Sequence, residues 1–147
     1  MSVRNRIAVL HGVNLDMLGR RPAAVYGGIT YDQLEQRISA FAAELDLEPR
    51  FFQTNHEGDF VEHLHRVEGL SDGIVLNPGA WTHYAWAIRD ALEVAAVPAV
   101  EVHLSDVEGR EEWRKVSVIA DLCVGRFYGK GLDGYREALE RLRQELR

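Results

Sequence analysis

Polar side chains that could bind a ligand or move a proton follow three short apolar runs of this sequence. The three groups contain His11 and Asn14, then Asn77 and His83, and then Glu101, His103 and Ser105. Any one of these residues could simply cap a strand or a helix. Together they favour another interpretation, because polar groups that converge on one place are typical of a pocket for a polar ligand.

The connection over residues 12–29 carries a tyrosine near two arginines. Arg20 and Arg21 precede Tyr26, which is followed by Gly27 and Gly28. A loop tyrosine more often packs than reacts, but positive charge beside it stabilises the phenolate and would make it a base. The connection has neither G-x-x-x-x-G-K-[ST] nor G-x-G-x-x-G, the glycine patterns that cradle nucleotide phosphates, so nucleotide binding has little support.

A second long connection, over residues 104–121, supplies more positive charge. Arg110 and Arg114 are four residues apart and would share a face if this segment is helical. The alternative is a solvated turn in which they pair with the neighbouring glutamates. Long connections in a compact domain are usually functional, which favours a place near the ligand.

Five short runs rich in Val, Ile and Phe are predicted to be the strands that position these residues. They are Arg6–His11, Arg50–Thr54, Gly73–Asn77, Ala99–His103 and Leu122–Phe127. Between them, apolar residues recur with the 3.6-residue period of helices over Tyr31–Leu45, Gly58–Leu70, Thr82–Ala95 and Leu132–Leu146. Thr30 and Gln33 fit a capping box at the start of the first helix.

Repeated strand–helix alternation indicates right-handed βαβ units and a parallel sheet covered on both faces. At this length we expect a flavodoxin-like, doubly wound α/β fold with five strands in the order 2-1-3-4-5, forming a single domain over residues 1–147. Sheets of this kind bind ligands beyond the carboxyl ends of their strands. The three polar groups follow three of those ends, so the sequence predicts that they meet in one site.

The formal net charge of −6 weighs against nucleic acids and anionic membranes as partners, since phosphate groups favour basic surfaces. Cys123 is the only cysteine, which excludes an internal disulfide and a cysteine-rich zinc site. No apolar stretch approaches the ~18 residues of a membrane span, and the apolar run near the N-terminus is too short for a signal peptide. We therefore expect a cytoplasmic protein.

Five motifs in chain order give the sequence a resemblance to the type II 3-dehydroquinate dehydratases over nearly the whole chain. The matched segments are Gly12–Leu15, Leu18–Gly27, Gln53–Gly58, Asn77–His83 and Glu101–Ser105, with an R-E-x-x-R pattern following at Arg110–Arg114. Any one motif alone would be weak. Five in order, each after the expected element, are specific.

The resemblance implies a reaction, the reversible anti-elimination of water from 3-dehydroquinate to 3-dehydroshikimate through an enolate, in the shikimate pathway or in quinate breakdown. It implies that Tyr26 is the base that takes the proton α to the ketone, beside Arg21 and Arg110, with Arg21 on a mobile lid. It also implies that His103, oriented by Glu101, is the acid that protonates the departing hydroxyl.

The same resemblance implies residues that bind the substrate and join subunits. Asn14 is similar to a residue that holds a water against the enolate oxygen, and Asp90 to one that reaches a neighbouring subunit's site in the family's trimers and dodecamers. No cofactor or metal is expected. The substrate's hydroxyls and carboxylate are expected to contact Asn77, His83, Arg114 and the backbone amides of Leu104 and Ser105.

Several residues depart from the family's pattern without removing a proposed catalytic group. Val13 replaces a proline, and unusual residues stand at Tyr84, Trp86, Val116 and Tyr128. They keep open a second hypothesis, a binding or regulatory paralogue that retains the pocket but has no turnover. A third hypothesis, a flavodoxin-like FMN carrier, is argued from the fold alone.

Overall fold

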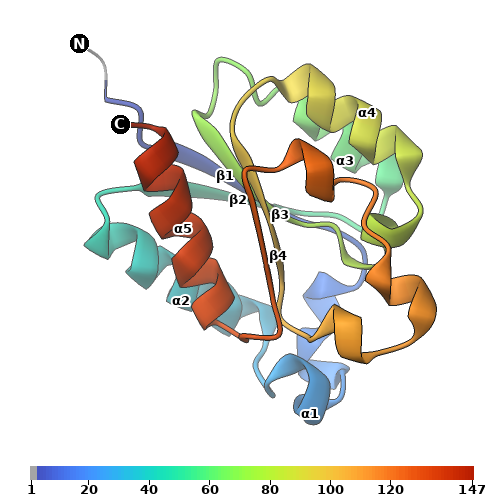
Figure 1. Cartoon of the computed structure of the whole chain (residues 1–147). Coiled ribbons are helices and arrows are strands. Elements are labelled where there is room, and N and C mark those ends of the chain that lie inside the picture. Colours follow the sequence, from blue (N-terminus) through green and yellow to red (C-terminus); the bar gives the residue numbers. More distant parts are fainter. Residues whose placement is uncertain (1–2) are drawn as a thin grey trace.

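The computed structural model describes residues 3–147, which contain a five-stranded parallel sheet (Figure 1). The strands pair in the order β2-β1-β3-β4-β5, which confirms the predicted doubly wound topology. Their bounds are β1 (Arg6–His11), β2 (Glu48–Gln53), β3 (Gly73–Asn77), β4 (Ala99–His103) and β5 (Gly125–Tyr128).

The three central strands β1, β3 and β4 begin and end at the predicted residues. Every residue of β3 and β4 is buried, as are all residues of β1 after Arg6. Strands covered on both faces read as continuous apolar runs, and this is why their bounds are easy to predict from sequence.

Helices cover both faces of the sheet (Figure 1). Leu34 of α2 and Leu139 of α5 pack with Val9 on one face, whereas Phe60 of α3 and Ile88 of α4 pack around Leu10 on the other. The helices are α1 (Ala23–Tyr26), α2 (Tyr31–Glu44), α3 (Glu57–His65), α4 (Trp86–Ala95) and α5 (Asp133–Glu145). None of the helices within residues 3–147 is long and apolar enough to cross a membrane.

The capping box at the start of α2 is confirmed. The backbone N–H of Gln33 donates to Thr30 Oγ1 at 3.2 Å, and the backbone N–H of Thr30 donates to Gln33 Oε1 at 3.0 Å. These reciprocal bonds satisfy two groups that a helix start leaves without partners. They fix the point at which the first long connection ends.

Two helix predictions were too long. The helix expected over Thr82–Ala95 begins only at Trp86, because residues Gly79–His83 form a 3₁₀ turn and the backbone then leaves helical geometry. The helix expected over Gly58–Leu70 ends at His65, and the residues after it turn back toward the sheet through Gly69, whose φ is 86°.

The two edge strands were also placed imperfectly. Leu122, the first residue of the run expected to form the last strand, belongs instead to a 3₁₀ turn, Ala120–Leu122, and β5 starts only at Gly125. Strand β2 starts two residues before the expected Arg50 and includes Pro49. Proline is tolerated at an edge, where one side of the strand has no partner.

The strand register places polar residues side by side at the carboxyl edge of the sheet. His11 is aligned with Asn77 across β1 and β3, and Glu101 with Arg126 across β4 and β5. His103 ends β4 opposite Tyr128. The predicted convergence of the three polar groups therefore follows from the register itself.

Candidate active site

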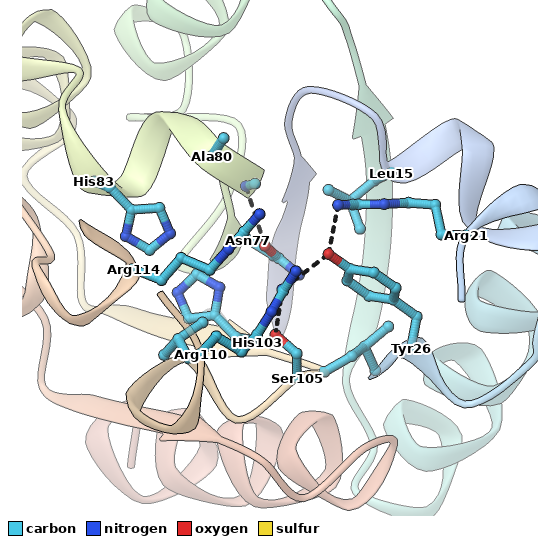
Figure 2. Close-up of a pocket in the computed structure, with 13 residues that line it drawn as sticks. Leu15, Arg21, Tyr26, Asn77, Ala80, His83, His103, Ser105, Arg110 and Arg114 are labelled. Carbon is cyan, nitrogen blue, oxygen red and sulfur yellow. Dashed lines mark hydrogen bonds between the residues drawn. The ribbon is translucent and has the colours of Figure 1, made fainter. Parts of the chain in front are cut away.

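A pocket lies beyond the carboxyl ends of β3 and β4 (Figure 2), where sheets of this kind bind their ligands. Three stretches of the chain line it, with the residues Leu15, Arg21, Tyr26, Asn77, Gly79, Ala80, His83, His103, Leu104, Ser105, Val107, Arg110 and Arg114.

Two arginines hold the phenolic oxygen of Tyr26. Arg21 Nη2 donates a short hydrogen bond to it, and Arg110 Nη1 donates a second at 2.9 Å (Figure 2). The Arg21 guanidinium also lies 3.9 Å from the centroid of the tyrosine ring. Two cationic donors on one phenolic oxygen place positive charge where a tyrosine that acts as a base would carry negative charge.

The local chain path explains how Tyr26 comes to lie between these arginines. Pro22 precedes the single turn of α1, a position in which its fixed φ suits a helix start. The helix ends directly after Tyr26, at Gly27, whose φ of 84° closes the turn with an N–H bond to Ala23. Arg21 and Tyr26 are thus brought together by one helical turn.

His103 and Glu101 form a buried pair at the end of β4. Glu101 is fully buried, and its Oε2 accepts a hydrogen bond from His103 Nε2 at 2.6 Å. The same carboxylate accepts hydrogen bonds from Ser117 Oγ at 2.7 Å and Arg126 Nε at 3.0 Å. Burial opposes ionisation of Glu101, but the bonds from His103 and Ser117 and the charge of Arg126 lower its pKa below the ordinary value.

The carboxylate therefore orients the imidazole. A carboxylate only accepts hydrogen bonds, so the ring nitrogen facing Glu101 must carry a proton. The other ring nitrogen of His103 has no hydrogen-bond partner within residues 3–147, and the residue lines the pocket. His103 can consequently exchange a proton with a ligand while Glu101 holds its orientation.

His83 is arranged as a hydrogen-bond acceptor. Its Nδ1 donates to the carbonyl oxygen of Val116 at 2.6 Å, which leaves Nε2 with a lone pair. Burial lowers the pKa of His83, and the charges of His103 and Arg114 lower it further, although the bond to Val116 acts in the opposite direction. The ring is thus neutral near pH 7 and suited to accept from a ligand hydroxyl.

Positive charge dominates the lining of the pocket. Arg21, Arg110 and Arg114 all reach it, and no Asp or Glu is among the lining residues. Burial lowers the pKa of Arg21, and the nearby charges of Arg110 and Arg114 lower it further. The Glu111 carboxylate, 3.0 Å from Arg114 Nε, partly offsets this charge from outside the lining. An anionic group of a ligand, such as a carboxylate, suits three guanidinium groups.

Close contact between two loops fixes the wall that carries Asn77. Gly12 donates its N–H to the Asn77 carbonyl at 2.9 Å, and a Cβ on Gly12 would lie 2.2 Å from the Pro78 carbonyl oxygen. Gly79 has φ 68°, and a Cβ there would lie 2.5 Å from the Val13 carbonyl oxygen. The glycines at these two positions are therefore required for the loops to meet.

Asn14 does not line the pocket, although the next residue, Leu15, does. Its side chain is exposed and its backbone is left-handed, with φ 68°, a conformation that asparagine tolerates. The backbone N–H of Asn14 donates to Asn55 Oδ1 at 2.8 Å, and Gln53 Nε2 donates to the Gly12 carbonyl at 3.2 Å. The Gln53–Gly58 motif thus supports the loop that carries Asn14.

Asp90 and the residues that depart from the family's pattern lie outside the pocket. Asp90 is exposed on α4 and does not reach this chain's pocket. The unusual residues Tyr84, Trp86, Val116 and Tyr128 do not line the pocket either, so they do not alter its shape directly. In the part of the chain from residue 3 onward, no group of three or more His, Cys, Asp or Glu side chains could hold a metal ion.

Sequence reasoning did not identify Ser117 and Arg126 as partners of Glu101. Arg126 lies 25 residues away in sequence and comes beside Glu101 only through the β4–β5 register. Ser117 lies in an irregular segment between two 3₁₀ turns. The available signal was weak, since Arg126 stands out only as a charged residue in an otherwise apolar strand prediction.

Known proteins resemble this chain over most of its length. Residues 5–143 match the family described as class II dehydroquinase. A relative from Thermotoga neapolitana named 3-dehydroquinate dehydratase is 50% identical over 139 residues, which cover 95% of this chain and 94% of the relative. A relative of the same name from Bacillus licheniformis is 49% identical over 133 residues, covering 90% of this chain and 92% of the relative.

Solved structures are similar in fold as well as in sequence. The type II dehydroquinase of Butyrivibrio crossotus has a TM-score of 0.89 and 40% identity, covering 95% of this chain and 97% of that one. The type II dehydroquinase of Propionibacterium acnes has a TM-score of 0.90 and 38% identity, covering 98% of this chain and 99% of that one.

Proposed function

Because the chain belongs to the class II dehydroquinase family, we propose that it is a 3-dehydroquinate dehydratase, with Tyr26 as the base and His103 as the acid. The reaction removes a proton next to the substrate's ketone and a hydroxyl group from the adjoining carbon. The observation that carries the assignment of roles is the phenolic oxygen of Tyr26 held by two guanidinium groups, in a pocket that also exposes the imidazole of His103.

Tyr26 takes the proton α to the ketone as a phenolate. The bonds from Arg21 and Arg110 stabilise that negative charge, and both arginines are already in place in this structure. Proton removal leaves an enolate, whose charge also needs stabilisation. We assign Asn14 to the water that contacts the enolate oxygen, since it lies in the loop that carries Leu15 into the pocket.

His103 gives a proton to the departing hydroxyl, which then leaves as water. Hydroxide is a poor leaving group, so the elimination needs this general acid. Glu101 fixes the orientation of the ring, and it is itself held by Ser117 and Arg126. Tyr26 and His103 reach the pocket from different sides (Figure 2), as an anti-elimination requires. The cycle closes when Tyr26 loses its new proton and His103 regains one.

The remaining pocket groups bind the substrate's carboxylate and hydroxyls. Arg114 supplies positive charge for the carboxylate, and His83 Nε2 is free to accept from a hydroxyl. The side chain of Asn77 and the backbone amides of Leu104 and Ser105 complete this set. The connection that carries Arg21 acts as a lid, and its closure would exclude water and strengthen the electrostatic interactions in the site.

We also propose that the protein is a homo-oligomer, a dodecamer built from trimers, in which Asp90 completes a neighbouring subunit's site. In support, Asp90 is exposed on α4, and two large aromatic side chains near the start of that helix, Tyr84 and Trp86, are 58% and 63% exposed. Exposed aromatic residues close together are typical of subunit contacts. The cytoplasmic setting and the single catalytic domain stay predictions from sequence.

The test of the reaction is the absorbance of the enone product when purified protein is mixed with 3-dehydroquinate. We expect turnover by the parent and a loss of about 10²–10⁴-fold in kcat for Tyr26→Phe and for His103→Ala, the range that general acid–base catalysis contributes. Folding of each variant is checked by far-UV circular dichroism.

Two substitutions outside the pocket serve as controls. Tyr128→Phe removes a hydroxyl that makes no hydrogen bond within residues 3–147, and His65→Ala removes an exposed imidazole at the end of α3. Both are expected to keep the parent's turnover. A folded parent without turnover would contradict the proposed reaction, and full activity of Tyr26→Phe would contradict the proposed base.

A further inference from the structure

One histidine has no part in the proposed reaction and is fully buried at the end of β1. His11 has no exposed surface, and burial lowers its pKa to about 3. The imidazole is therefore neutral at any pH at which the enzyme would work. A neutral imidazole has one N–H donor and one acceptor nitrogen, and both need partners when the ring is buried.

Both ring nitrogens of His11 meet tyrosine hydroxyls from helices on the same face of the sheet. Nδ1 lies 3.0 Å from the hydroxyl of Tyr31 on α2, and Nε2 lies 3.0 Å from the hydroxyl of Tyr135 on α5. The hydroxyl of Tyr135, which is also fully buried, accepts a hydrogen bond from Asn77 Nδ2 at 3.4 Å. A continuous row of hydrogen bonds thus joins Tyr31, His11 and Tyr135 to a residue of the pocket.

The available protons determine which group donates and which accepts in each hydrogen bond of this row. Asn77 Oδ1 accepts from the Gly79 N–H at 3.1 Å, so the amide nitrogen faces Tyr135 and can only donate to it. The proton of the Tyr135 hydroxyl then has His11 Nε2 as its acceptor. It follows that the proton of His11 is on Nδ1 and is donated to Tyr31.

Burial reinforces that direction, because both tyrosine hydroxyls stay protonated. Burial raises the pKa of Tyr135, and burial together with the nearby Glu35 carboxylate raises the pKa of Tyr31. The carboxylate of Glu35 lies near the Tyr31 hydroxyl at the far end of the row. From Asn77 to the Nδ1 proton of His11, every donor is matched with an acceptor.

We propose that Tyr135 and His11 are positioning residues that fix the orientation of the side-chain amide of Asn77. One N–H of this amide donates to Tyr135, and the other then points into the pocket as a donor to a substrate hydroxyl oxygen. The proposal rests on the proposed function for the identity of the substrate. Without the Tyr135 hydroxyl, the amide would be held only by Gly79 and could rotate. With the hydroxyl present, the orientation of the amide is fixed before the substrate binds, which reduces the entropy lost on binding.

The kinetic test is a double-mutant cycle between Tyr135→Phe and Asn77→Ala. Tyr135→Phe keeps the ring and removes the hydroxyl, and we expect it to raise KM about 3- to 10-fold, the equivalent of one neutral hydrogen bond, with little change in kcat. In the Asn77→Ala background the same substitution is expected to change KM less than twofold, since the group it positions is gone. Tyr128→Phe is the control for removal of a tyrosine hydroxyl outside the pocket.

The cycle separates positioning from a general loss of stability. A merely structural role would give the same change in KM or kcat in both backgrounds, and that result would overturn the proposal. An unchanged KM for Tyr135→Phe in the parent background would overturn it as well.

The tautomer test needs no substrate and therefore does not depend on the proposed reaction. The ¹⁵N chemical shifts of imidazoles distinguish the two neutral tautomers and the protonated ring, and the signals of His11 are identified by their absence from His11→Asn. We expect a neutral His11 with its proton on Nδ1 throughout pH 5–8. A proton on Nε2, or protonation of the ring within this range, would overturn the proposed direction of the row.

Discussion

At the residue scale, the three pocket or near-pocket histidines differ in function because their partners differ. His103 faces a carboxylate and is able to give a proton, whereas His83 donates to a backbone carbonyl and presents an acceptor. His11 faces only tyrosine hydroxyls and keeps one neutral form. In the proposed mechanism the same side chain thus serves as acid, as acceptor or as positioning group according to what the fold places next to it.

His11 also makes the stability of the protein depend on pH. Its pKa in the folded protein, about 3, lies below the ordinary 6.5, so between these values the unfolded chain binds a proton that the folded protein does not. Its contribution is fully present above pH 6.5 and is lost as pH falls toward 3. At pH 4.5 the loss is about 2–3 kcal/mol by linkage.

The measurement is denaturant unfolding of the parent and of His11→Asn at pH 7 and at pH 4.5. The decrease in the free energy of unfolding between the two pH values is expected to be smaller in the variant by about 2–3 kcal/mol, since asparagine does not titrate. Equal decreases in the two proteins would mean that His11 takes up a proton in the folded state. The carboxylates are common to both proteins and cancel in this comparison.

At the scale of elements, the sequence predicted β1, β3 and β4 to the residue but not the segments that follow them. Buried strands are mostly apolar, and runs of Val, Ile, Leu and Ala mark them even where β4 contains the buried Glu101. The helical pattern predicts a start at Thr82, but Thr82 and His83 belong to the 3₁₀ turn Gly79–His83, and the backbone leaves helical geometry at Tyr84. Only tertiary contacts distinguish the two, such as the bond from His83 to Val116.

The residues of the site were predictable to different degrees for the same reason. Tyr26, His103 and the arginines stand in short motifs similar to those of the family, and this resemblance gave their expected roles. Arg126, Ser117 and Tyr135 act through residues that are distant in sequence, and their contacts depend on strand register or on how a helix packs. A single sequence carries no direct signal for contacts of that kind.

The close approach of the loops after β1 and β3 gives a prediction at this scale. Gly12→Ala would place a Cβ 2.2 Å from the Pro78 carbonyl oxygen, and backbone atoms cannot move away cheaply. The two loops must separate, so we expect a loss of about 1–3 kcal/mol of stability together with a raised KM, because Asn77 is displaced. Denaturant unfolding and steady-state kinetics measure the two effects.

Gly58→Ala is the matched control, since no atom lies within 4 Å of a Cβ added in this first turn of α3. Alanine is the better helix former, so this variant is expected to match or slightly exceed the parent in stability, with unchanged kinetics. Parent-like stability and KM in Gly12→Ala would show that the loops adapt, contrary to the contact described above.

At the scale of the whole molecule, the proposed assembly makes a prediction about mass and about mixed subunits. Twelve chains of 16.6 kDa give a particle of about 200 kDa, which light scattering after size-exclusion chromatography measures. If Asp90 completes a neighbouring subunit's site, each site combines His103 of one subunit with Asp90 of another. The substitutions Asp90→Ala and His103→Ala then impair a site from different subunits. Co-assembly of these two impaired variants is then expected to restore part of the turnover.

Restoration depends on a site that has both an intact His103 and an Asp90 from a different subunit. A monomer with full turnover would contradict the proposed role of Asp90. An oligomer in which mixing restores nothing would retain the assembly but remove Asp90 from the neighbouring site.

The central claim is that Tyr26 and His103 perform separate proton transfers, and deuterium exchange tests it most directly. The measurement is the loss of the ¹H NMR signal of the substrate proton α to the ketone when His103→Ala is incubated with 3-dehydroquinate in D₂O. Tyr26 can still form the enolate in this variant, so we expect exchange without elimination, and no exchange in Tyr26→Phe. Exchange by Tyr26→Phe at the rate of His103→Ala would contradict the account, because some other group would then be the base.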